Sequence, residues 1–106
     1  IIVETQTMSS AEQFLASLVD SGRVETVGRH TAGASGNPIV FRLPGARNVR
    51  FSSADFRRND GTPIEGVGIA PDVQVDWTVG DMRQGRDPDL SAAEALLLDS
   101  LAQGPR

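Results

Sequence analysis

The turn TMSSAE at Thr7–Glu12 constrains this chain more than any other stretch. An apolar run precedes it, and Ile1–Glu4 is therefore predicted as a strand buried on both faces. Behind the turn, apolar residues recur at the spacing of an amphipathic helix that packs on a core. These positions are Ala11, Phe14, Leu15, Leu18 and Val19. Ser9 and Ser10 thus lie where a buried strand turns into a helix.

Two roles are open to a serine at this turn. The first N–H groups of a helix lack internal partners, and the helix dipole there favours negative charge. A serine in that place can attack a carbonyl while the N–H groups stabilise the oxyanion. However, Ser9-x-x-Glu12 also matches a capping box, in which Ser9 caps the helix and Glu12 reaches back. The local pattern alone favours the cap.

Composition narrows the function classes. The chain has 106 residues, enough for one domain with a modest core. It has no cysteine, which excludes thiolate metal sites, and neither a membrane-length apolar run nor a signal peptide is recognisable. A net charge of -4 and dispersed arginines argue against nucleic-acid binding. Because no lysine is present, a lysine general base cannot come from this chain.

Strands and helices alternate along the remaining chain. The first helix is expected to end near Ser21, with Gly22 as its C-cap. A short strand, Arg23–Val27, should pair in parallel with the first strand. The other expected segments are a loop at Gly28–Pro38, strands at Ile39–Leu43, Val49–Phe56 and Val73–Val75, and a short helix from a Thr78 cap to about Gly85.

A second serine box predicts the start of the last helix. Ser91-x-x-Glu94 matches a capping box, and Leu90 before it is placed for a hydrophobic staple. Several apolar residues of this helix are then available for packing. They are Ala92, Ala95, Leu96, Leu98 and Leu101.

Four segments in order resemble one family, the S41 serine peptidases of the C-terminal processing and tricorn-like group. They cover nearly the whole chain. Thr7–Glu12 is similar to the family pattern T-x-S-x-x-E, and Val27–Ala34 to V-G-E-x-T-x-G-K/G. Asp60–Asp72 is similar to G-x-x-I-E/Q-G-x-G-I-x-P-D, and Gly85–Leu90 to G-R-D-P-x-L. Any one match is weak, but four in the same order are strong support.

The resemblance implies roles for particular residues. Ser9 matches the nucleophile, and the Ser10 amide matches one donor of the oxyanion hole. Ala34 occupies the lysine position of the processing subtype, so the chain is similar to the tricorn-like members instead. Their base is a histidine from an N-terminal part of the protein, outside this chain. Glu65 matches the glutamate that supports that histidine, and Gly33 and Ala34 lie where substrate is expected to bind.

Two titratable residues have simpler interpretations. Glu65 is either that support or a solvated loop carboxylate. His30 is the single histidine, but it occupies a variable position of the motif, so a loop-packing role is favoured. Arg29 replaces the motif glutamate just before it, which leaves the usual local pairing in question.

The sequence therefore predicts an α/β fold, an incomplete ClpP/crotonase-like core in which residues 1–106 form the C-terminal portion of an S41-type peptidase domain. The expected partners are peptide or unfolded polypeptide substrate, the upstream half of the same domain and further copies of the chain, with no metal and no cofactor. The resemblance slightly favours a bacterial periplasmic or extracytoplasmic location. Two alternatives are kept: a non-catalytic ligand-binding module related to retinoid-binding repeats, and a scaffold whose Ser9 only caps a helix.

Overall fold

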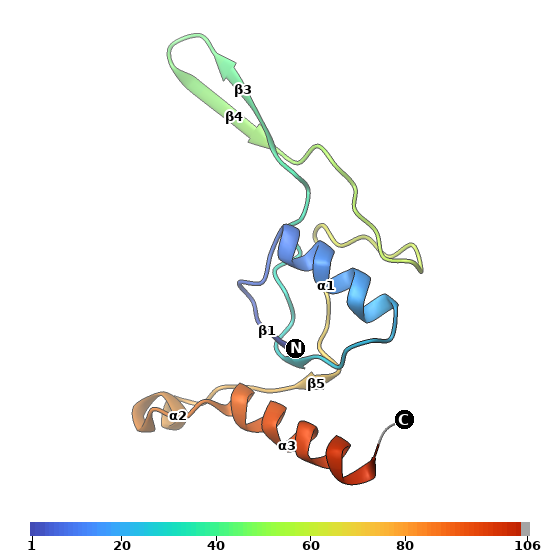
Figure 1. The fold of residues 1–106 in the computed structure, drawn as a ribbon. Coiled ribbons are helices and arrows are strands. Elements are labelled where there is room, and N and C mark those ends of the chain that lie inside the picture. The colour runs from blue at the N-terminus through green and yellow to red at the C-terminus, as the bar shows by residue number, and fades with distance from the viewer. Residues whose placement is uncertain (105–106) are drawn as a thin grey trace.

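The computed structural model describes residues 1–104. A small parallel sheet lies at its centre, with strand order β1-β2-β5. β1 is Ile2–Val3, β2 is Val27–Gly28 and β5 is Val73–Gln74. Helix α1, Ser10–Asp20, lies on one side of the sheet, and helix α3, Pro88–Gln103, crosses the other (Figure 1). The predicted α/β class is confirmed.

The strand–helix–strand unit β1–α1–β2 forms as expected. β1 and β2 pair in parallel, with Ile2 opposite Val27 and Val3 opposite Gly28. β2 is shorter than predicted and begins four residues later, at Val27, although the carbonyl oxygens of Glu25 and Thr26 still accept bonds from Ile1 and Val73. The apolar core beneath α1 is compact and draws on three segments far apart in the sequence. It consists of Val3, Leu15, Ala16, Ile64 and Ile69, with Val19 and Phe56 packed against it.

Gly28 shows why the second motif has a glycine inside a strand. Its φ is +128°, and a Cβ there would lie 2.1 Å from the carbonyl oxygen of Val3. No side chain fits between two strands at that distance. The glycine therefore permits the close pairing of β1 and β2 directly below the serine turn.

A hairpin projects from this body (Figure 1). It is built from β3, Ile39–Leu43, and β4, Arg47–Phe51, in antiparallel register. Phe41 and Phe51 stack on one face, with ring centroids 5.3 Å apart. The prediction for β3 is confirmed, whereas β4 begins two residues earlier and ends five residues earlier than predicted. Residues 52–56 leave the hairpin because they turn back to the body.

The short helix α2, Val79–Gln84, has the predicted boundaries. Thr78 and Asp81 form a capping box, and Gly85 ends the helix in the left-handed conformation. In contrast, the predicted start of α3 at Ser91 is wrong. Asp87 caps this helix and Pro88 occupies its first turn, while the Ser91 hydroxyl bonds back to the Asp87 carbonyl oxygen at 2.9 Å. The Asp-Pro pair was the better start signal, since proline favours the first helical turn.

A buried carboxylate fastens α3 to the sheet. Asp89 accepts hydrogen bonds from Arg29 at 3.0 Å and from the indole N–H of Trp77 at 2.8 Å. The Arg29 guanidinium also lies 5.7 Å from the Trp77 ring. Arg29, which departs from the family pattern, thus has a partner within the fourth motif of the same chain.

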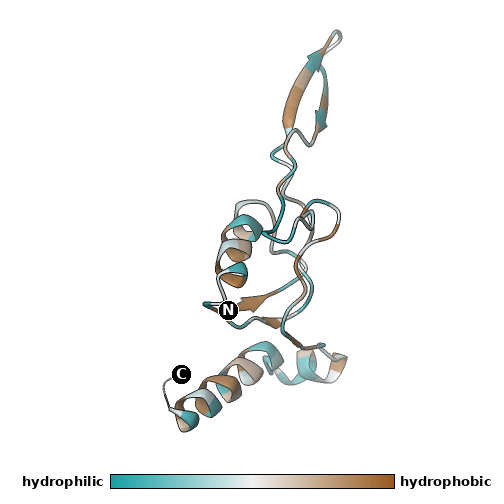
Figure 2. Cartoon of the chain, turned by 90° about the vertical axis from the view of Figure 1, so that its right-hand side faces the viewer, coloured by the Kyte–Doolittle hydropathy of each residue, from teal (hydrophilic) through white to brown (hydrophobic). Residues whose placement is uncertain are grey.

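Burial of apolar residues is lower than predicted. The expectation that Ile1–Glu4 is buried on both faces is wrong, because Val3 is buried but Ile2 is 44% exposed on the open face. Ala11 and Phe14 of the predicted helix stripe are also exposed. Apolar residues of the hairpin and α3 likewise remain uncovered (Figure 2). The chain is elongated, with extents of 62 × 38 × 15 Å, and many large apolar side chains of the hairpin and α3 lie at its surface.

Among residues 1–104, no helix is both long enough and apolar enough to cross a membrane.

Candidate active site

Ser9 lies on a strained turn directly before α1. Its φ of 57° and ψ of -128° belong to a region that side-chain-bearing residues rarely adopt. Its N–H donates to the Ala34 carbonyl oxygen at 2.9 Å, which fixes the turn against the glycine loop. The Ser9 side chain is exposed and makes no capping hydrogen bond. The capping interpretation of Ser9 is therefore wrong, and the hydroxyl is left available.

Glu12 explains why the turn takes this form. Its side chain is fully buried and faces the glycine loop instead of reaching back to Ser9. One carboxylate oxygen accepts from the Thr31 hydroxyl at 2.6 Å and the Gly33 amide at 2.7 Å. The other accepts from the Ala34 amide at 2.9 Å. The predicted second half of the capping box is thus replaced by a connection between the first and second motifs.

The helix start offers a free donor for an oxyanion. The Ser10 N–H belongs to the first residue of α1, where no carbonyl of the preceding turn of helix exists. Within residues 1–104 it donates no hydrogen bond. This is the donor that the family resemblance assigns to the oxyanion hole.

The third motif packs directly on the second. The Thr31 amide donates to the Ile69 carbonyl oxygen at 3.0 Å, and the Ile69 amide donates to the Thr31 hydroxyl at 2.8 Å. The Gly66 amide donates to the Gly33 carbonyl oxygen at 2.7 Å. A Cβ on Gly33 would lie 2.8 Å from the Gly68 backbone nitrogen. Glycines at these points let the two loops approach closely.

Glu65 reaches the same loop from its other side. Its carboxylate accepts from the Ser35 amide at 2.7 Å and from the Ser52 hydroxyl at 2.6 Å. The Ser52 hydroxyl first, then the amides of Ser35 and Gly36, hold the pKa of Glu65 below its ordinary value, against desolvation. This half-buried residue is therefore a fixed, ionised carboxylate at neutral pH, not a freely solvated one.

One peptide group connects Ser9 and Glu65. The carbonyl of the Ala34–Ser35 peptide accepts from the Ser9 amide, and the N–H of the same peptide donates to Glu65. Three of the four family motifs thus meet around residues 31–35. The sequence predicted Ser9 and Glu65 for this site, but it gave no role to Thr31 or Ser52.

The remaining predicted residues have other partners. Gly33 and Ala34 both donate their N–H groups to the Glu12 carboxylate, so a substrate that paired with those amides would have to displace these bonds. Their carbonyl oxygens each accept one hydrogen bond within the chain and have a second lone pair. His30 is exposed, and its Nδ1 lies 3.1 Å from the Thr31 carbonyl oxygen. No hydrogen bond within residues 1–104 joins it to Ser9 or Glu65.

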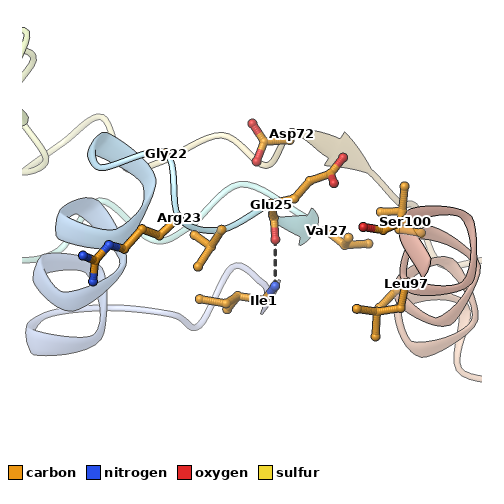
Figure 3. A pocket seen from close by; sticks show the side chains of 11 residues that line it. Ile1, Gly22, Arg23, Glu25, Val27, Asp72, Leu97 and Ser100 are labelled. Atoms are coloured by element: carbon orange, nitrogen blue, oxygen red, sulfur yellow. Dashed lines mark hydrogen bonds between the residues drawn. The ribbon is translucent and has the colours of Figure 1, made fainter. Parts of the chain in front are cut away.

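A hollow of about 640 Å³ lies elsewhere, between the sheet and α3 (Figure 3). It is bordered by Glu25 and Val27 on one side and by Leu97 and Ser100 of α3 on the other. Ser9, Ser10 and Glu65 do not line it. Within residues 1–104, no group of three or more His, Asp or Glu side chains is placed to hold a metal ion.

The fold and the turn together define a class. An exposed serine on a strained turn between a strand and a helix is the local arrangement by which α/β hydrolytic enzymes present a nucleophile. The chain belongs to Peptidase family S41, whose family model matches residues 1–75.

Several proteins resemble this chain over most of its length. A putative peptidase from Parabacteroides merdae superimposes with a TM-score of 0.82 at 32% identity, over 92% of this chain and 30% of that one. Mature CPAF complexed with lactacystin gives a TM-score of 0.73 at 29% identity, over 78% of this chain and 16% of that one. The tricorn protease shares the fold, with a TM-score of 0.82 at 24% identity over 92% of this chain and 10% of that one.

Curated relatives are much longer than this chain. A Chlamydia pneumoniae protein is 27% identical over 110 residues, which is all of this chain and 18% of that protein. A carboxy-terminal-processing protease of Bartonella bacilliformis is 24% identical over 94 residues, 89% of this chain and 22% of that protein. The chain therefore spans about a fifth of each of these two relatives, as those shares show.

Proposed function

We propose that this chain supplies the nucleophile half of a tricorn-like serine endopeptidase site. The observation that carries the proposal is the strained φ of 57° at Ser9, with its exposed hydroxyl free of any capping bond. Strain of this kind costs about 1–3 kcal/mol and persists where the surrounding structure enforces it. Here the buried Glu12 and the Ser9 amide bond provide that enforcement.

Each residue then has a chemical role. The Ser9 hydroxyl attacks a peptide carbonyl, and a histidine from outside this chain takes its proton. The Ser10 amide stabilises the oxyanion, and loss of one such donor typically lowers kcat 10²–10³-fold, roughly. Glu65, held ionised by its hydrogen bonds, orients the histidine and stabilises its protonated form. Water then hydrolyses the acyl-enzyme.

Covalent labelling tests this proposal. The full-length protein is treated with a fluorophosphonate, which phosphonylates an activated serine, and the labelled peptide is identified by mass spectrometry. Ser9→Ala should abolish labelling and peptide hydrolysis. Ser17→Ala is the matched control, because it removes an exposed serine hydroxyl of the same helix that lies outside the site. Labelling that survives in Ser9→Ala would refute the role of Ser9.

The same experiment separates the proposal from a binding module. Such a module retains the fold of the site but has no activated serine. Absence of labelling at Ser9 in the native protein, together with binding of an apolar ligand such as retinol, would favour the module over the peptidase.

A further inference from the structure

The hairpin contributes a hydroxyl to the serine site. Ser52 follows the last residue of β4, and its Oγ donates to Oε1 of Glu65 at 2.6 Å. From this geometry we infer that Ser52 is a positioning residue that holds the Glu65 carboxylate in its working orientation. The inference rests on the proposed function of Glu65 and deepens it.

The Ser52 hydroxyl and the Glu65 carboxylate both lie close to Gly36. A Cβ on Gly36 would lie 2.2 Å from the Ser52 Oγ and 2.9 Å from Glu65 Oε1. The φ of Gly36 is not in the left-handed region, so the backbone alone does not require glycine there. The absence of a side chain instead leaves room for the Ser52–Glu65 hydrogen bond.

The register of the hairpin decides which serine reaches Glu65. The Ser53 and Ala54 amides both donate to the Gly36 carbonyl oxygen, at 2.8 and 2.9 Å. Ser53 directs its hydroxyl to the Asn37 carbonyl oxygen at 2.6 Å, away from Glu65. Since neighbouring residues of an extended segment point to opposite sides, Ser52 alone of this pair faces the carboxylate.

The carboxylate depends on few groups. Oε1 is held by Ser52, while Oε2 is held by the Ser35 amide. In the described chain, the groups that act on Glu65 are this hydroxyl and the amides of Ser35 and Gly36, and none of them titrates or carries a charge. Without Ser52, Oε1 loses its hydroxyl donor and the carboxylate is free to turn about its Oε2 contact.

The test uses three variants of the full-length protein, assayed for peptide hydrolysis across a pH series. Ser52→Ala should lower kcat about tenfold with KM unchanged, because the hydrogen bond that holds the Glu65 carboxylate in place is lost. The pKa of Glu65 should rise toward its ordinary 4.5, because the carboxylate loses the Ser52 hydroxyl donor. Ser52→Thr keeps the hydroxyl and should restore both. Ser53→Ala, the matched control, should behave as the native protein.

A second measurement reads the contact directly. Carboxyl NMR of glutamate-labelled protein should show a higher Glu65 pKa in Ser52→Ala but not in Ser53→Ala. Native kcat and an unshifted Glu65 pKa in Ser52→Ala would overturn the inference, as would equal losses in both serine variants. Hydrolysis that persists in Ser9→Ala would instead overturn the proposed function, and the positioning role of Ser52 in that reaction with it.

Discussion

Replacing Glu12 by glutamine should weaken the hydrogen bonds that connect the start of α1 to residues 31–34. The buried carboxylate accepts three hydrogen bonds, two at one oxygen and one at the other. Glutamine keeps one acceptor oxygen, which can still serve Thr31 and Gly33. Its NH₂ group then faces the Ala34 N–H, so one charge-assisted bond is lost and a part-buried amide has no acceptor. Such a loss costs about 2 kcal/mol.

Hydrogen exchange is the appropriate assay, because the effect is local. A loss of 2 kcal/mol corresponds to about 30-fold faster opening. In the full-length protein, the amides of Gly33 and Ala34 should exchange faster by that factor, as followed by mass spectrometry of the peptide that spans residues 31–35. Peptide hydrolysis should fall too, because the Ala34 carbonyl no longer fixes the Ser9 turn.

Glu94→Gln provides the matched control. Glu94 is an exposed helix residue of α3, where such a change should alter stability by no more than about 0.5 kcal/mol. If exchange in residues 31–35 is as slow in Glu12→Gln as in Glu94→Gln, the argument that Glu12 holds the turn together is refuted.

Two further predictions concern stability. In urea unfolding, Gly28→Ala should reduce the free energy of unfolding by more than about 4 kcal/mol, because its Cβ would overlap the Val3 carbonyl oxygen. Gly45 also has a positive φ but open space around it, so Gly45→Ala should reduce the free energy of unfolding by only about 1–2 kcal/mol. The Thr26 hydroxyl and then its amide hold the pKa of Asp72 below its ordinary 3.8, so Asp72 stabilises the fold above that pH, and this contribution is lost as pH falls through the lowered pKa. The Asp72→Asn variant should not show this loss of stability in acid unfolding. An acid transition the same as that of the native protein would contradict the assignment of the loss to Asp72.

The strand–helix–strand unit was predictable from the sequence because it depends on local spacing. The apolar period after Ser10 and the Thr78 box each act over a few residues. The predicted cap at Gly22 is one residue late, because Ser21 is the C-cap of α1. The same local logic failed at Ser91, where Asp87 and Pro88 provided a stronger start for α3. It also failed for Phe14, because periodicity identifies a helix face without showing which neighbour covers it.

The sequence by itself determined that a serine stands between a strand and a helix, and that four motifs occur in the order of one peptidase family. Only the tertiary structure decided which partners that serine and the two glutamates have. Glu12 bonds with residues about 20 positions later, and Glu65 with residues 13 and 30 positions earlier. Local patterns cannot encode such partners. These partners come together only in the folded chain, where Gly33 and Gly68 let the two loops that carry them approach closely. In that arrangement the Ser9 hydroxyl makes no capping hydrogen bond.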